Sequence, residues 1–506
     1  MQKILINVEG GEKRIAVLKN NALEDFSLER TDNRKIVGNV YRGKVDNVIP
    51  GMQAAFVNIG LEKNAFLHSS DVLDSEACQE LLDEEIEPFP QNGNKSSSGK
   101  IENLIKKDKD ILVQVVKDQI GSKGARITTN ISLPGRYLVL MPNSAKSGIS
   151  RKISNKEERT RLRSVLSELK IPKGMGIIIR TVGGGEETKK FKRDLKYLLG
   201  EWKRIRRRNI ISKTPACLHK ELDIVLKTLR DVMADDIDEI LIDDKREFRV
   251  VKRFVSIIYP EARDKVKFYD GREPMFDRFG IESEISKALS RKVWLRCGGS
   301  IVIDRTEALT TIDVNTSKHV GSKSLEDTVH RTNMEAAEEI ALQLKLRNIG
   351  GIIIIDFIDM KSRRNQKAVL RKLEEFLKKD RAKTSISAIS PLGLVEMTRQ
   401  RVKESWIEDM YEACKCCSGK GVIKNSITIS LEIIRNTRRI LGKSKIQKLK
   451  ILCNPEIAKK LEHYRDLKML ERKARVEIEI TGDYNKNFEE VIYCDPNGKE
   501  IDLKRL

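Results

Sequence analysis

The sequence is poor in histidine and in long apolar runs, and both shortages exclude classes of protein. The 506 residues include only five histidines, and no two have the spacing of an HExxH metal motif. The chain therefore offers few histidines for a nuclease that uses paired histidines as acid and base. Any hydrolysis is better explained by carboxylates that hold a metal ion. The longest aliphatic run, Ile352 to Ile355, is far too short to cross a membrane. The polar first residues are unlike a signal peptide, so we expect a cytoplasmic protein without a membrane span.

Cysteine is too sparse for a disulfide scaffold, with eight residues of which three are clustered. In that cluster Cys414 and Cys417 form a CxxC followed by a glycine-rich turn, which is typical of half a zinc site. Structural zinc takes four ligands and the chain has no second CxxC, so we expect Zn²⁺ to be shared by two chains in a homodimer. Cys416 could replace either neighbour as a ligand. A redox role is less favoured, because we expect no thioredoxin-like βαβ unit around the motif.

Charge is the most informative part of the composition. Lys and Arg number 97 against 75 Asp and Glu, a formal net charge of +22. A surplus of this size predicts a polyanionic partner, most simply nucleic acid. Hydrophobic residues make up 39% of the chain, enough for sizeable cores, and the length suggests three or four domains.

Strand-like patterns dominate the first part of the chain. Residues 1–35 alternate like strands, and Ile36 to Val72 holds short strands separated by glycines, which favours a small β barrel. The acidic and Ser/Gly-rich stretch 74–100 predicts a long mobile loop inserted between strands. A basic helix is expected from about Glu186 to Arg208, and a separate basic α/β piece from 423 onward.

Two aspartates stand at the ends of strands that we expect to be neighbours. Asp313 and Asn315 share one face of a strand that ends near them, and a run of four isoleucines, expected to be a buried strand, ends in Asp356. Carboxylates at adjacent strand ends suit Mg²⁺, which needs few protein ligands. The alternative is that these aspartates cap helices or form surface pairs. Asp304 and Asp359 lie close in sequence, so the assignment within each cluster stays open.

Lys383 is a weaker candidate for the same site. Its ammonium group could stabilise charge that develops on a phosphate. A solvated lysine near a helix end is the better interpretation from its spacing alone.

Two aromatic residues lie on the polar face that alternation assigns to the expected barrel. Phe56 and Phe66 are offset by one residue from Ala55, Val57 and Leu67. Exposed aromatics with basic neighbours such as Lys123 are candidates for stacking nucleic-acid bases and binding phosphates. The alternative is that both rings fill the barrel and that the faces are reversed.

A possible anion site precedes the basic helix. Arg180 and Thr181 end a strand and lead into Gly183-Gly184-Gly185. A cation, a hydroxyl and a glycine turn before a helix can bind a phosphate, although three glycines alone are usually just a turn. The lysine of a nucleotide-binding loop is absent.

Taken together, these motifs resemble the RNase E/G endoribonucleases of bacteria over essentially the full length. The segments that carry the resemblance are 54–57, 123–129, 148–151, 179–181, 311–315, 351–360, 394–401 and the cysteine cluster.

The resemblance implies hydrolysis of single-stranded RNA at internal sites, leaving a 5′-phosphate and a 3′-hydroxyl, in rRNA and tRNA processing and mRNA decay. By match to the family, Asp313 and Asp356 hold Mg²⁺, Asn315 orients the water or the metal shell, and Lys383 matches a basic position. Phe56, Phe66 and Lys123 match an RNA-binding surface. The residues that match a pocket sensing a 5′-monophosphate are Gly135, Val139, Arg151, Arg180 and Thr181.

The resemblance also implies a multidomain α/β and α+β architecture. The expected parts are a split RNase H-like domain (1–35 and 225–288), an OB-fold RNA-binding domain (36–129), a 5′-sensor region (130–224), a DNase I-like catalytic domain (289–410), a zinc link (411–422) and a small C-terminal domain (423–506). Pairing of homodimers into tetramers stays open.

Some features depart from the family pattern or favour another function. Lys415 replaces a usual proline in the zinc link, the 74–100 loop is longer than usual, and no long C-terminal tail follows, which favours the shorter family members. The alternatives are a non-catalytic RNA-binding protein and, more weakly, a DNA nuclease. The positive charge is expected to serve RNA at the barrel face, the 5′-end pocket and the helix end near Arg206.

Overall fold

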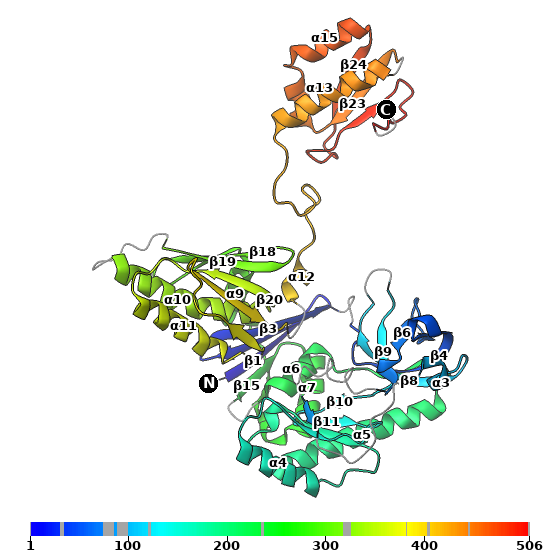
Figure 1. Cartoon of the computed structure of the whole chain (residues 1–506), viewed down its shortest axis with the longest axis vertical. Helices are drawn as coiled ribbons and strands as arrows, with labels where there is room; N and C mark the ends of the chain where they lie inside the picture. Colours follow the sequence, from blue (N-terminus) through cyan, green and yellow to red (C-terminus); the bar gives the residue numbers. More distant parts are fainter. Residues whose placement is uncertain are drawn as a thin grey trace. The chain divides into compact units, whose positions relative to one another are not determined.

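A computed structural model of the chain divides into two compact units, residues 1–406 and 407–506 (Figure 1). It describes residues 2–30, 35–73, 86–88, 100–119, 123–233, 237–316, 325–380, 382–401, 405–443 and 446–503. No helix in these ranges is both long and apolar enough to span a bilayer.

The first sheet joins two distant parts of the chain. Its strands are, in spatial order, β16 (Val266–Phe268), β15 (Ile237–Ile242), β1 (Gln2–Glu9), β2 (Glu12–Lys19) and β3 (Ala22–Arg30). Short turns make β1, β2 and β3 antiparallel, whereas β15 pairs with β1 in parallel. The helices of this region are α6 (Ile224–Val232), α7 (Lys245–Ile258), α8 (Met275–Arg278) and α9 (Ile281–Leu289), with the 3₁₀ turn η3 (Pro260–Lys265). The two segments expected to form a split domain therefore share one sheet and one core.

A closed five-stranded barrel follows, which confirms the barrel prediction. Its strands are β4 (Val40–Ile49), β5 (Ala54–Asn58), β6 (Ala65–His68), β9 (Arg126–Thr128) and β8 (Asp110–Lys117), and β4 pairs with β8 to close it. Strand β14 (Ala216–His219) adds to β4. Short helical pieces are η1 (Pro50–Met52), α1 (Ser70–Leu73) and α3 (Ile101–Leu104).

A third sheet includes three residues of the stretch 74–100, for which we expected a long mobile loop. Its order is β10 (Leu133–Pro134), β11 (Leu138–Met141), β13 (Gly176–Ile179), β12 (Gly148–Ser150) and β7 (Ile86–Pro88). Strand β7 pairs with β12, because its backbone completes an otherwise open edge. Residues 74–85 and 89–99 lie outside the described ranges.

Helices α4 (Lys156–Glu168) and α5 (Thr188–Ile211) accompany the third sheet. The 3₁₀ turn η2 (Thr181–Gly183) precedes α5. The basic helix expected from about Glu186 to Arg208 is α5, shifted by two or three residues at each end. Its predicted apolar stripe is buried: Phe191, Leu195, Leu198, Trp202 and Ile205.

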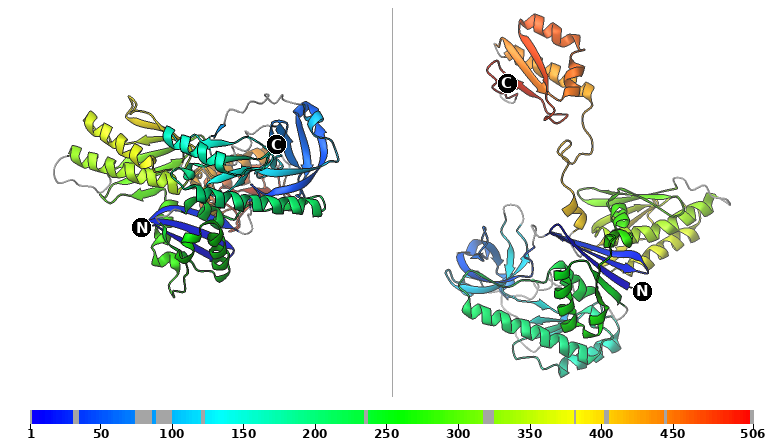
Figure 2. Two further views of the ribbon diagram at one scale, coloured as in Figure 1. Left: turned by 90° about the horizontal axis from the view of Figure 1, so that it is seen from below. Right: turned by 180° about the vertical axis from the view of Figure 1, so that it is seen from behind.

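The fourth sheet carries the two aspartates. Its order is β17 (Lys292–Trp294), β18 (Ser300–Arg305), β19 (Leu309–Asn315), β20 (Gly351–Asp356), β22 (Leu394–Arg399) and β21 (Thr384–Ile386). Figures 1 and 2 show α10 (Leu325–Leu346) and α11 (Arg363–Leu377) side by side on one of its faces. The strand expected to be buried throughout is buried only on the side facing these helices. Ile353 and Ile355 are in the core, whereas Ile352 is 52% exposed on the other face.

The second unit contains α13 (Ser426–Lys443), β23 (Lys448–Cys453), α14 (Pro455–Leu461), α15 (Arg465–Ala474), β24 (Glu477–Gly482) and β25 (Ile492–Cys494). Strands β23 and β24 are parallel and are joined through α14 and α15, which makes a βαβ unit. The expectation that no such unit accompanies the CxxC motif was wrong. The short helix α12 (Trp406–Met410) lies at the boundary between the units.

Candidate active site

The two aspartates occupy facing positions on adjacent strands. Strands β19 and β20 run parallel, and their register pairs Asp313 directly with Asp356. Residues on either side of each aspartate, such as Ile312 and Ile355, are buried against α10 and α11. Alternation therefore turns both carboxylates to the opposite, exposed face of the sheet. The arrangement brings the two predicted metal ligands together.

Neighbouring polar groups shape this pair electrostatically. The Asn315 side-chain amide donates a hydrogen bond of 2.7 Å to Asp313 Oδ2, which restrains that carboxylate. Burial, followed by the charges of Asp313 and Asp359, raises the pKa of the Asp356 carboxyl. A site that raises the pKa of an acid by crowding carboxylates gains stability when a cation neutralises them.

The open assignment within each aspartate cluster now has an answer in geometry. Asp304 accepts a 2.7 Å hydrogen bond from Arg291 and is neutralised by it, so it does not add to the carboxylate pair. The charge of Asp359 contributes to the raised pKa of Asp356, but Asp359 forms no three-carboxylate metal group with the pair in the described ranges. In the sequence, only its closeness to Asp356 indicated that Asp359 could affect the site.

The donor set suits Mg²⁺ better than a softer metal. It offers exposed carboxylate oxygens and an amide, with no sulfur or imidazole ligand described beside them. No group of three or more His, Cys, Asp or Glu side chains arranged to hold a metal occurs in the described ranges. Two carboxylates with water in the remaining positions are the kind of site that Mg²⁺ accepts.

Lys383 does not join the aspartates. Its carbonyl accepts the N–H of Gln400, and the adjacent Arg399 pairs with Gly351 at the start of β20. Asp356 lies five residues further along that strand, about 17 Å at ~3.3 Å per residue. A lysine side chain is too short to cover this distance. The assignment of Lys383 to catalysis stays a prediction, and this position does not favour it.

The barrel places the two phenylalanines on its outer face. Phe56 and Phe66 are paired across β5 and β6, with ring centroids 5.9 Å apart in an edge-to-face arrangement. Ala55, Val57 and Leu67 are fully buried, whereas the two rings are half-buried. The alternative in which both rings fill the barrel is therefore wrong.

Lys123 lies beside this aromatic pair. The segment that it begins runs along β6, where the Phe66 N–H donates to Ala125 O at 2.7 Å. A Cβ on Gly124 would lie 2.1 Å from Asn64 O, so only glycine allows this close approach. The Lys123 side chain is exposed.

Arg180 is the centre of a largely buried ionic cluster, in which its own side chain is 13% exposed and that of Asp231 27%. Its Nη1 donates to Asp231 at 2.7 Å and to Gly135 O at 2.8 Å. Arg230 pairs with Asp231 as well. Burial alone would raise the pKa of the Asp231 carboxyl, but the charges of Arg230 and Arg180 outweigh it and hold that pKa well below its usual value. The sequence contained no signal for Asp231, which lies 51 residues from its arginine partner.

Asp194 fixes the turn that receives Arg180. Its buried carboxylate accepts backbone N–H bonds from Arg136, Tyr137 and Leu138 at 3.2, 2.8 and 2.9 Å. A Cβ on Gly135 would lie 2.6 Å from both carboxylate oxygens, which explains the glycine. Burial raises the pKa of Asp194 although these N–H bonds act in the opposite direction.

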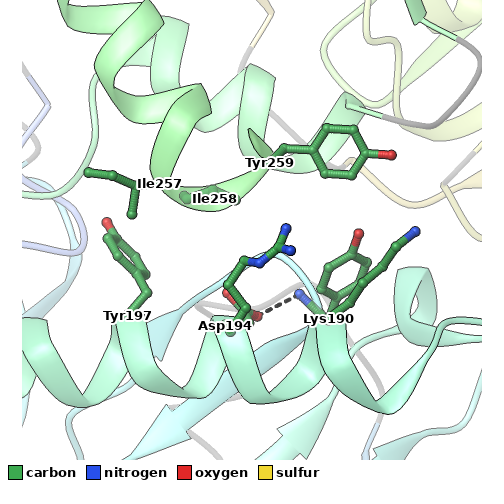
Figure 3. A pocket seen from close by; sticks show the side chains of 8 residues that line it. Lys190, Asp194, Tyr197, Ile257, Ile258 and Tyr259 are labelled. Atoms are coloured by element: carbon green, nitrogen blue, oxygen red, sulfur yellow. Dashed lines mark hydrogen bonds between the residues drawn. The ribbon is translucent and has the colours of Figure 1, made fainter. Parts of the chain in front are cut away.

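A small cavity lies between Asp194 and the end of α7. Figure 3 shows Asp194, Lys190 and Tyr197 on α5 facing Ile257, Ile258 and Tyr259. Its volume of about 10 Å³ is room for about one water. This junction therefore packs two helices together and is too small for a substrate.

The remaining residues of the predicted 5′-end pocket differ in exposure. The Thr181 hydroxyl bonds the Ser150 hydroxyl at 2.9 Å, and the adjacent Arg151 is exposed. Val139 is buried in β11 with Met141 and Ile178. The structure thus gathers these residues around one sheet end, with Arg180 held inside and Arg151 outside.

The cysteine cluster lies on an exposed turn ahead of α13. The Gly421 N–H donates to Cys417 Sγ at 3.3 Å, and Gly419 and Gly421 have φ of +86° and +72°. Backbone hydrogen bonds from Cys417 and Cys416 lower the pKa of the Cys414 thiol. Turns that direct N–H groups at sulfur suit thiolate ligands, but one chain supplies too few of them for a closed zinc site.

Comparison with known proteins identifies the class to which this fold and site belong. Residues 132–402 match the ribonuclease E/G family, and residues 413–492 match the thioredoxin-like domain of RNase E/G. The second match includes the CxxC motif, so the sequence argument against a thioredoxin-like environment was wrong.

Individual relatives give the same answer over most of the chain. Ribonuclease G of Escherichia coli K12 is 42% identical over 460 residues, covering 91% of this chain and 92% of that protein. Ribonuclease G of Haemophilus influenzae is 40% identical over 459 residues, covering 91% of each. Ribonuclease E of E. coli K12 is 38% identical over 438 residues, 86% of this chain but 40% of that larger protein. The chain belongs to the ribonuclease E/G family.

Proposed function

We propose that this protein is a Mg²⁺-dependent endoribonuclease that cleaves single-stranded RNA and leaves a 5′-phosphate and a 3′-hydroxyl. Membership of the ribonuclease E/G family supports the endoribonuclease activity. The observation that carries the metal dependence is the direct pairing of Asp313 with Asp356 on an exposed sheet face.

Each polar residue of the site has a distinct task in this proposal. Asp313 and Asp356 would hold the metal, and Asn315 keeps the Asp313 carboxylate in one orientation. Asp359 adds negative charge that favours a bound cation. Bound Mg²⁺ would polarise the phosphodiester and lower the pKa of water.

Two further surfaces would hold the RNA. The half-buried rings of Phe56 and Phe66 offer stacking area, and the exposed Lys123 offers a phosphate contact. Thr181 and Arg151, near the fixed Arg180, would recognise a 5′-monophosphate and stimulate cleavage.

Assembly and cellular role complete the proposal. Cys414 and Cys417 of two chains would share Zn²⁺ in a homodimer, with the exposed turn open to a second copy. The substrates would be rRNA and tRNA precursors and mRNA in the cytoplasm.

The decisive experiment compares matched RNAs that carry a 5′-monophosphate or a 5′-triphosphate, with Mg²⁺ or with a chelator. We expect cleavage only with Mg²⁺ and faster cleavage of the monophosphorylated RNA. Asp313→Asn and Asp356→Asn should each slow cleavage roughly a thousandfold but keep RNA binding. Wild-type protein that binds but never cuts RNA would instead identify a non-catalytic RNA-binding protein.

The zinc link has a separate test. Cys414→Ser or chelation should shift the mass in solution towards the monomer, measured by light scattering. An unchanged mass would exclude zinc as the bridge.

A further inference from the structure

The exposed face of α11 concentrates positive charge that none of the sites described above uses. Arg363, Arg364, Lys367 and Arg371 are all exposed and line an open hollow of about 370 Å³. The only other residue that lines it is Ala368. Arg363 and Arg371 are eight residues apart, about 12 Å along the helix axis.

These four cations form no ion pair with any residue that the structure describes. None of them takes part in a salt bridge or a side-chain hydrogen bond there. By contrast, Lys372 on the same helix pairs with Glu338, and Lys345 on α10 pairs with Glu24. Like charges held together without partners repel each other, so a bound anion would stabilise the arrangement.

The cationic face lies on the other side of the sheet from the carboxylate pair. Ile312 and Val314 of β19 are buried in the core formed with α11, and Asp313 between them faces away. Figures 1 and 2 show α11 covering that buried side. A phosphodiester held on α11 is therefore a different one from the phosphodiester beside Asp313 and Asp356.

The residues that line the hollow indicate which kind of polyanion it would bind. Three of its four cations are guanidinium groups, whose forked donors match phosphate oxygens. It contains no aromatic ring for stacking a base and no large apolar side chain to anchor a protein partner. These properties favour a nucleic-acid backbone held without regard to sequence.

We propose that Arg363, Arg364, Lys367 and Arg371 form an accessory RNA-backbone site. It anchors a part of the substrate that lies outside the cleaved segment. The proposal rests on the proposed RNA-cleaving function, and it adds a contact that increases with the length of the RNA.

The test uses the full-length protein and fluorescent RNAs of two lengths that share one cleavage site. The quadruple variant R363Q/R364Q/K367Q/R371Q should bind the long RNA roughly tenfold more weakly or worse, with a much smaller loss for the short RNA. Each single-strand phosphate contact contributes about 0.7 to the slope of log Kd against log salt, so the slope should fall by up to ~3. Binding is measured in chelator, so it can be read even if the protein cleaves nothing.

A matched control removes similar charge elsewhere in the same unit. Arg246, Arg249 and Arg253 are exposed on α7, and R246Q/R249Q/R253Q should leave the binding of both RNAs unchanged. Circular dichroism and thermal unfolding verify that both variants fold.

Several outcomes would overturn the accessory site. Equal loss in the α7 control would mean that only net charge matters. Equal loss for short and long RNA, or no loss at all, would exclude a contact outside the cleaved segment. Unchanged RNA affinity together with lost binding of polyglutamate would assign the surface to an acidic protein. Failure of the wild type to cleave would reject the proposed function alone.

Discussion

The carboxylate pair and the Arg180 cluster both consist of charged residues, but they satisfy those charges in opposite ways. Asp313 and Asp356 are exposed, and the only described hydrogen bond to either side chain comes from Asn315. Arg180 and Asp231 are enclosed and bonded to each other, to Arg230 and to backbone. The first site is open to an external cation, whereas the second already contains its own counter-ions.

This difference separates function from stability. Changing an exposed carboxylate that no cation neutralises removes little from the folded state, because no buried charge is left without its partner. Removing one member of an enclosed ionic cluster leaves the other buried without compensation. The two regions should therefore respond to equivalent Asp→Asn changes in opposite ways.

The largest expected effect is on catalysis at the open site. Asp356→Asn should slow RNA cleavage roughly a thousandfold, about 4 kcal/mol of transition-state stabilisation, since a metal ligand is lost. The free energy of unfolding should stay unchanged or rise slightly, because repulsion with Asp313 and Asp359 is relieved. Single-turnover cleavage and urea unfolding measure the two quantities, and a strongly destabilised variant would break the contrast.

In the Arg180 cluster, the equivalent substitution should mainly reduce stability. Asp231→Asn should lower the free energy of unfolding by about 3–5 kcal/mol, because Arg180 and Arg230 lose their shared carboxylate. Glu261→Gln is the control, since Glu261 also pairs with an arginine, Arg193, but is half exposed. That control should cost less than about 1 kcal/mol. Equal effects in urea titrations would contradict the role given to burial.

Substitutions of the aromatic pair on the barrel surface, like those at the carboxylate pair, should affect function more than stability. Phe56→Ala and Phe66→Ala should each weaken single-stranded RNA binding by about 1–3 kcal/mol, the range for a lost stacking contact. Val57→Ala, on the buried face of the same strand, should destabilise the fold and leave RNA affinity little changed. Fluorescence anisotropy and thermal unfolding compare the two faces, and loss of RNA binding in the Val57 variant at full folding would reverse the assignment.

A smaller, pH-dependent effect on folding stability is expected from Glu158, which lies near the Arg180 cluster. Hydrogen bonds from Arg161 and then from the Gly185 N–H lower the pKa of Glu158 to about 2. Its folded-state pKa is below its unfolded value, so its contribution is present above about pH 4.5 and is lost as the pH falls towards 2. Wild type should exceed Glu158→Gln in stability by less than about 1 kcal/mol at neutral pH. A difference that grows on acidification would contradict this sign.

Substitution of Lys383 should have the smallest effect on the rate of RNA cleavage. Because it lies about 17 Å along the sheet from Asp356, Lys383→Met should change kcat less than about threefold, under ~0.7 kcal/mol. Rapid-quench measurements at saturating RNA test this. A loss as large as that of Asp356→Asn would restore the catalytic assignment and contradict the geometry.

Local pattern predicted much of the architecture around the site. The alternation in 309–315 and the isoleucine run before Asp356 indicated two strands with a helix between them, and this connection makes the strands parallel. Parallel strands joined by a helix end at the same edge, so the meeting of Asp313 and Asp356 followed from sequence. The burial of only alternate isoleucines did not, because it depends on one sheet face being uncovered.

Contacts between distant segments were beyond local pattern. The strand β7 inside the expected loop forms because β12 presents an open edge, and the partner of Arg180 comes from a helix 51 residues away. The thioredoxin-like domain match includes the CxxC motif, but its paired strands lie well after that motif in the chain, so the residues next to the cysteines gave no sign of a βαβ unit.

The sequence by itself determined the scarcity of histidine, the charge of +22 and the periodicities that place side chains on one face or the other of a strand or helix. These are local properties of composition and backbone geometry. Tertiary structure alone decided which charges are neutralised. It enclosed Arg180 with Asp231, whereas Asp313, Asp356 and the cations of α11 form no ion pair within the described part of the chain, because pairing depends on which elements pack together.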